Sequence, residues 1–137
     1  MDYLKGRQNK FFKHALSAPF IWLPLLAVII LDILVEIYHH ICFPIYGIPK
    51  VKRSAYIQII DRNKMKYLSP LEKLGCMYCG YVNGGLLYFK EIAGLTEKYW
   101  CGIMHEGKPG FITQEDQVKQ NFAAFNNEAD FKHKYKQ

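Results

Sequence analysis

The chain has 137 residues, of which half are hydrophobic, and it carries a formal net charge of +6. This length fits one domain, and a composition with 15% aromatic residues excludes an intrinsically disordered chain. A basic chain suits anionic lipid head groups or nucleic acid. We expect lipid rather than nucleic acid, because the basic residues crowd around one apolar run near the N-terminus.

A basic arm of residues 1–17 leads into a predicted membrane-embedded helix at residues 18–42. The core of that helix is an apolar run, residues 20–38, close to the ~20 residues that a spanning helix needs. A cleaved signal peptide is the alternative, but its apolar part has only ~7–15 residues, and this run also contains two acids. Basic residues are nearly balanced on the two sides of the run, so a single span and a monotopic segment both stay open.

Four polar residues of the predicted helix share one of its faces. They follow the spacing i, i+4, i+7 and i+8, and are Asp32, Glu36, His39 and His40. Ionisable groups at membrane depth usually face a partner, a cavity or a metal. Glu36 and His39 have the spacing of helical ligands that share a metal in di-iron bundles. A second metal site and packing against a partner helix or head groups are both compatible with this stripe, and packing is the simpler interpretation.

Residues 43–110 are predicted to form a small cysteine- and histidine-rich metal-binding domain. Residues 55–60 and 65–68 read as two short strands around a turn, which predicts a β-hairpin. A capping-box pattern at residues 69–72 predicts a short helix that ends near Gly75. Asn83 is then expected to cap a second helix, which runs from about residue 85 through residue 100.

The strongest local motif is a pair of cysteines, Cys76 and Cys79, followed by a glycine. This six-residue CxxCGY piece resembles a rubredoxin or zinc-ribbon knuckle. A cysteine and a histidine at i and i+4 follow later, and the complete predicted ligand set is Cys76, Cys79, Cys101 and His105. Tetrahedral zinc accepts three cysteines and one histidine, and iron is the alternative metal. Glu97 is a candidate to hold the ring of His105, and the cysteine pair alone also fits a dithiol redox pair.

Two longer signatures extend this motif. YCGYxNG at residues 78–84 and YWCxIxH at residues 99–105 resemble a family of small uncharacterised bacterial proteins. The similarity runs from about residue 39 to residue 105 and implies a bacterial origin, without an established activity. We therefore expect the chain in the bacterial cytoplasmic membrane, with the metal domain on the cytoplasmic side.

The last stretch, residues 111–137, is predicted to be a helical, basic tail. A helix is expected from about residue 113 to residue 125, broken by the asparagines at 126 and 127. The remaining residues fit either a short amphipathic helix at the membrane surface or a frayed end.

Together these patterns predict a mainly α protein, with one N-terminal membrane helix, a short hairpin and a metal-closed helical domain. The expected function is that of a membrane-anchored zinc protein, a subunit or accessory factor of a membrane assembly, with other membrane proteins or a second copy as partners. One alternative is an iron-dependent redox protein or membrane metalloenzyme that uses the cysteine/histidine set or the polar stripe. The other is an anchored CxxC thiol oxidoreductase. The sequence does not decide whether the protein is an enzyme.

Overall fold

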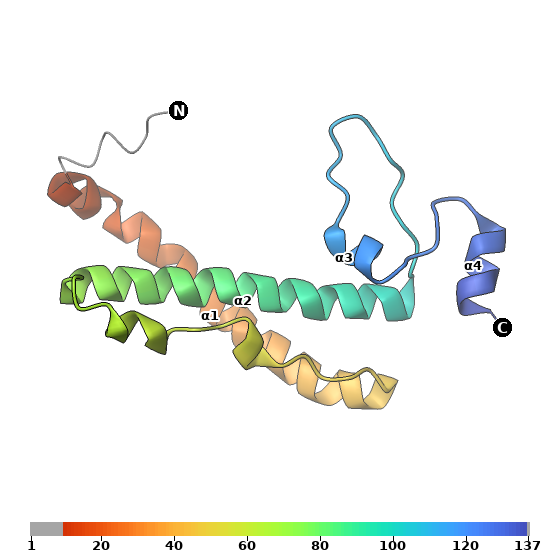
Figure 1. Cartoon of the computed structure of the whole chain (residues 1–137), viewed down its shortest axis with the longest axis horizontal. Coiled ribbons are helices and arrows are strands. Elements are labelled where there is room, and N and C mark those ends of the chain that lie inside the picture. The colour runs from red at the N-terminus through yellow and green to blue at the C-terminus, as the bar shows by residue number, and fades with distance from the viewer. Residues whose placement is uncertain (1–9, 137) are drawn as a thin grey trace.

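The computed structural model describes residues 10–136, which form a mainly helical fold around one pair of long helices (Figure 1). The prediction of a mainly α protein is therefore confirmed. In chain order the elements are α1 (Lys10–Tyr46), the 3-10 helices η2 (Arg53–Ala55) and η3 (Ile60–Lys64), α2 (Pro70–Trp100), α3 (Glu115–Lys119) and α4 (Glu128–Tyr135).

Helix α1 contains the predicted membrane helix and extends beyond both of its expected ends. It has 37 residues and includes Pro19, Pro24 and Pro44. It ends at Gly47, whose φ of +69° lies in the left-handed region that favours glycine. The stretch from Phe12 to Tyr46 is long and apolar enough to cross a membrane, by length and composition. Only 11% of its most apolar window is buried inside the molecule, so most of this stretch faces outward.

Residues 47–69 form an irregular connection, here called the return segment, which leads from the end of α1 back to the start of α2 (Figure 1). The β-hairpin expected within it is absent, and no strand occurs between residues 10 and 136. These residues form η2, η3 and turns instead, because their backbone packs against α2 rather than against itself. The carbonyl of Gln58 lies 3.1 Å from the position that a Cβ on Gly80 would take, and that of Tyr56 lies 2.5 Å from the equivalent position on Gly84.

Helix α2 begins where the sequence predicted and then continues for 31 residues. The Ser69 side chain accepts from the backbone of Glu72, and the Glu72 carboxylate accepts from the Ser69 N–H, so the capping box is confirmed. The expected break after Gly75 does not occur. Asn83 donates from its side chain to the carbonyl of Cys79 inside the helix instead of starting a new one. Gly80 and Gly84 lie inside the continuous helix, where they leave room for the backbone of the return segment.

Helices α1 and α2 run in the same general direction and cross each other obliquely (Figure 1). The hydroxyl of Tyr78 donates to the carbonyl of Ile21 near their N-terminal ends, at 2.7 Å. Near their C-terminal ends the rings of Tyr46 and Tyr99 stack with centroids 4.7 Å apart. Between these points lies the core, whose buried members are Val28, Phe43, Tyr88, Phe89 and Ile92.

The C-terminal part is attached to the end of α2. A parallel bridge joins Ile103 and Ala123, and α3 packs against α2. Helix α3 is shorter than the predicted helix at residues 113–125, because Asn121 takes a left-handed φ of +55° and ends it. The asparagines therefore do not break that helix, which has already ended at Lys119; instead, the side chain of Asn127 accepts from the N–H of Asp130 and caps α4.

Candidate functional site

The polar stripe of α1 faces the rest of the molecule. Asp32 and His39 are buried, with exposures of 9% and 2%, and Glu36 is partly buried between them. His40 lies at the edge, where its side chain is 58% exposed. The stripe that the sequence predicted therefore exists as one continuous surface, and three of its four members are shielded by α2 and the return segment.

The two carboxylates of the stripe share one cation, the guanidinium of Arg53. Its Nη2 donates to Oδ2 of Asp32 at 2.7 Å, and its Nη1 donates both to Oδ1 of Asp32 and, at 2.8 Å, to Oε1 of Glu36. The hydrogen bonds to Asp32 are the main cause that raises the pKa of Arg53 above its usual value. A fork-shaped donor that meets a carboxylate at two points is the strong form of this contact.

A tyrosine of α2 completes the surroundings of Asp32. The hydroxyl of Tyr81 donates to Oδ2 of Asp32 at 2.7 Å. Burial, followed by this hydrogen bond, raises the pKa of Tyr81 to about 12. The neutral hydroxyl is thus the form that this environment favours, and in this form it donates to the Asp32 carboxylate.

His39 has both ring nitrogens engaged. Its Nε2 accepts the backbone N–H of Val51 at 2.9 Å, so this nitrogen carries no proton. Its Nδ1 lies 3.1 Å from the hydroxyl of Tyr88, which is consistent with a neutral ring that bears its proton there. Burial, with a contribution from Glu36, raises the pKa of Tyr88 to about 12. His39 therefore ties the return segment to α1 and α2.

A metal ion at the polar stripe would have to displace these contacts. The ligand atoms of Glu36, His39 and His40 lie within 4.8 Å of one another, which is close enough for a shared ion. However, Nε2 of His39 already accepts from Val51, and Glu36 already holds Arg53. The guanidinium occupies the place of the cation, so the donor set fits an ion-pair network better than a metal.

The predicted cysteine/histidine set is not brought together by this fold. Cys76 and Cys79 lie inside α2, whereas Cys101 caps its C-terminal end. Cys79 and Cys101 are separated by 22 positions, which correspond to roughly 33 Å of helix. His105 follows beyond the helix, 3.8 Å from the Glu97 carboxylate, which also accepts from Gln117. The expected proximity of Glu97 to His105 is thus present, but one ion cannot bind all four predicted ligands.

The cysteine pair also differs from the expected knuckle. All four cysteines are free thiols, and Cys76 and Cys79 line a shallow hollow together with Arg62, Gly80 and Asn83. Side chains three residues apart on a helix have Cβ atoms about 5–6 Å apart. A disulfide needs about 3.5–4.5 Å. Oxidation of this pair would therefore require the two Cβ atoms to approach each other by about 1–2 Å, with a local distortion of α2.

Sequence reasoning missed the residues that neutralise the stripe. Arg53 was counted only among the basic residues that follow the apolar run, and its contact with Asp32 spans 21 residues. Tyr81 and Tyr88 were not singled out either. Their spacing of seven residues places both on one face of a helix, and this signal would have paired them with a neighbouring polar stripe.

The outward surface of α1 is the other candidate site. From Phe20 to Ile37 its exposed positions are all apolar, because the acids point inward. The most exposed large members are Phe20, Leu23, Leu26, Ile30, Ile33, Leu34 and Ile37. This surface is far more extensive than the scattered apolar residues of a water-exposed helix.

No family model, curated protein or solved structure matches this chain. The resemblance to a family of small bacterial proteins therefore stays a prediction.

Proposed function

We propose that this protein is a non-catalytic membrane component, held in lipid by α1, that serves as a subunit or accessory factor of a membrane assembly. The observation that carries the proposal is the uninterrupted apolar outer surface of α1. A helix that is apolar on its exposed side and polar only toward its own domain suits lipid rather than water. The net charge of +6 supports an anionic surface such as the cytoplasmic leaflet of a bacterial membrane.

The ion-pair network supports a structural role for the stripe. Asp32 and Glu36 are both paired with Arg53. His39 is hydrogen-bonded to the backbone of Val51 and lies within hydrogen-bond distance of the Tyr88 hydroxyl. A partner helix or a metal is not needed to neutralise them. We therefore propose the stripe as the joint that holds the return segment and α2 on the membrane helix.

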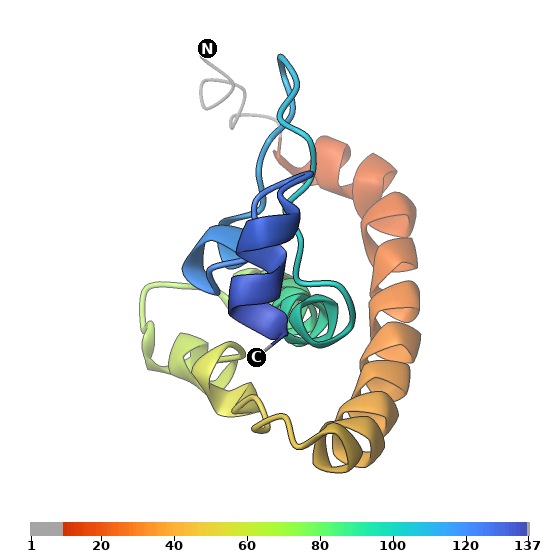
Figure 2. The same cartoon turned by 90° about the vertical axis from the view of Figure 1, so that its right-hand side faces the viewer.

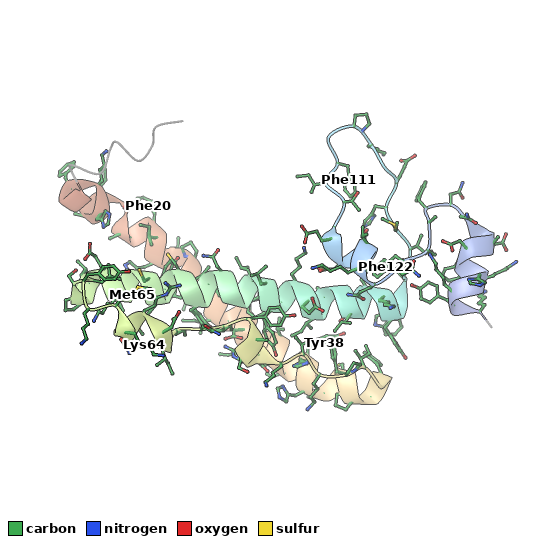
Figure 3. All side chains as sticks on the ribbon, in the orientation of Figure 1. Phe20, Tyr38, Lys64, Met65, Phe111 and Phe122 are labelled. Atoms are coloured by element: carbon green, nitrogen blue, oxygen red, sulfur yellow. The ribbon has the colours of Figure 1, made fainter. Side chains whose placement is uncertain are left out.

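The loop between α2 and α3 supports the role in an assembly. It extends away from the helix pair and carries Phe111 (Figure 3), and the neighbouring Ile112 is 87% exposed. Apolar side chains on a projecting loop are a common form of protein contact site. Val118 and Phe125 add exposed apolar area to the same C-terminal part.

Membrane fractionation with two matched variants tests both parts of the proposal. The chain is expected in the membrane pellet after washes with high salt and with alkaline carbonate. Leu23→Gln/Ile30→Gln/Ile37→Gln on α1 should release it, whereas Ile112→Gln/Val118→Gln/Phe125→Gln should not. The second variant should instead reduce the size of the detergent-solubilised complex. A wild-type chain that salt alone removes from the pellet would contradict attachment through α1.

The zinc and iron sites and the thiol oxidoreductase remain predictions from the sequence. The four predicted zinc ligands lie apart in this fold and the polar stripe is engaged in ion pairs, while Cys76 and Cys79 are free thiols within one helix. Elemental analysis of the purified protein decides whether a metal is present.

A further inference from the structure

The relative direction of the two long helices restricts how α1 can sit in lipid. Tyr78 contacts Ile21 near one end of the pair and Tyr99 contacts Tyr46 near the other. In between, the position of a Cβ on Gly85 lies 4.0 Å from Val28. Because α2 accompanies α1 over this length, any orientation that takes α1 across a bilayer also takes α2 across it.

In an orientation that takes α1 and α2 across a bilayer, the return segment would also lie inside the bilayer. It runs beside the helix pair, with its backbone against Gly80 and Gly84 and with Arg53 at the middle of α1. Its backbone is irregular, and it carries charged residues at exposed or partly exposed positions, namely Lys50, Lys52, Asp61, Arg62, Lys64 and Lys66. Irregular backbone that faces lipid does not occur in the hydrocarbon region, and each charge there is costly. A crossing orientation therefore conflicts with this segment.

The positions of the helices are compatible with a different orientation of α1 in lipid. In Figure 2, α1 follows one side of the molecule, while α2, the return segment, α3 and α4 lie on the other. Helix α1 bows outward in this view, and its two ends turn toward the side of the other elements. The apolar surface of α1 thus forms one face of the molecule, and the charged elements lie behind it.

The centre of this face follows from the helix period. Val28, Asp32 and His39 point toward the rest of the molecule and are buried. At 100° per residue the opposite side of the helix is occupied by positions 23, 30 and 37. Leu23, Ile30 and Ile37 are 68%, 52% and 53% exposed, so they mark the centre of the apolar face.

We propose that α1 lies in the plane of a single leaflet, with Leu23, Ile30 and Ile37 in the acyl chains and α2 on the water side. This inference rests on the proposed attachment to lipid and adds its geometry. It places both ends of α1 on the same side of the membrane, as their nearly balanced basic residues suggest. The basic residues of the return segment then face the head groups of an anionic leaflet, which they complement in charge.

Sidedness is tested by protease protection of the full chain with one epitope tag at each terminus. Sealed inverted and right-side-out membrane vesicles are prepared from the same expressing cells. An in-plane α1 exposes both tags in one vesicle type and protects both in the other. A spanning α1 exposes one tag in each type, and this result would overturn the inference. Absence of the chain from the vesicles would instead overturn the attachment itself, so the two failures are distinguishable.

Depth is tested on the protein reconstituted into vesicles of phosphatidylglycerol and phosphatidylcholine. Trp22→Phe/Trp100→Phe removes both native tryptophans, and one tryptophan is returned at position 23, 30 or 37. Quenching by lipids with nitroxides at different depths then locates each ring. An in-plane helix gives three similar depths, whereas a spanning helix places position 30 about 10 Å deeper than the other two, since seven residues separate them. Ile112→Trp in the same background is the water-side control and should not be quenched by the deep nitroxides.

Discussion

Arg53 and Asp32 face each other with two parallel hydrogen bonds, Nη1 to Oδ1 and Nη2 to Oδ2, across 21 residues of sequence. This ion pair attaches the return segment to α1. The same guanidinium also reaches Glu36. One side chain of the return segment therefore neutralises the two carboxylates of α1.

Removal of this cation should destabilise the fold. Arg53→Ala leaves two carboxylates without their partner, and we expect a loss of about 2 kcal/mol in the free energy of unfolding, between the values for surface and buried pairs. Chemical unfolding in detergent, followed by circular dichroism, measures it. Arg62→Ala is the matched control, because Arg62 lies 3.6 Å from Asp61 near the surface, and its effect should be small. Equal losses for both variants would contradict the role of Arg53.

The close approach of the return segment to α2 makes a second prediction. Gly84→Ala places a Cβ 2.5 Å from the Tyr56 carbonyl, so the backbone must move, at a cost of about 1–3 kcal/mol. Gly75 lies in the same helix, and a Cβ added there by Gly75→Ala would have no neighbouring atom within 4 Å. This substitution should raise stability by about 0.5–1 kcal/mol, because alanine favours helix over glycine. Melting curves of the two variants should shift in opposite directions, and a common direction would refute the packing.

Alkaline pH should weaken the joint through its tyrosines. The pKa values of Tyr81 and Tyr88 are each raised to about 12 in the folded chain, and an unfolded tyrosine titrates near ~10. The folded state therefore binds more protons in this window, so stability falls as pH rises from 10 toward 12. Ultraviolet absorbance of tyrosinate should show Tyr81 and Tyr88 among the groups that titrate latest. Tyr81→Phe should remove one of them, while Tyr67→Phe, at an exposed position, should leave both.

The separation of the cysteines predicts how their substitution acts. Cys101→Ser should leave unchanged any metal bound near Cys76 and Cys79, because roughly 33 Å of helix lies between them. Elemental analysis and melting curves of Cys101→Ser and of Cys76→Ser/Cys79→Ser provide the comparison. Loss of the same metal from both variants would show that the four ligands meet, and would contradict a continuous α2.

The features that could be predicted from the sequence depend on local periodicity. The apolar run and the stripe that begins at Asp32 are set by spacing along one helix, and both are present. The capping box at Ser69 is equally local. By contrast, the neutralisation of Asp32 by Arg53 depends on the path of the return segment. No local sequence pattern predicts that path.

The errors share one physical cause. The pattern predicts a helix end at Gly75 and a turn at Gly80, although an interior glycine also serves where another backbone comes close, as at Gly80 and Gly84. With a helix end at Gly75, Cys76 and Cys79 would lie on a turn between two helices, where Cys101 could approach them. In the structure all of these residues belong to or cap one continuous helix. The predicted hairpin failed for the same reason, because residues 55–68 pack on Gly80 and Gly84 rather than on each other.

The order of residues along the chain also bears on biosynthesis. Asp32 and Glu36 precede Arg53 in the chain, so their carboxylates are synthesised before the side chain that neutralises them. A chain truncated before Arg53 would contain the complete apolar helix but would lack the counter-ion of its two carboxylates.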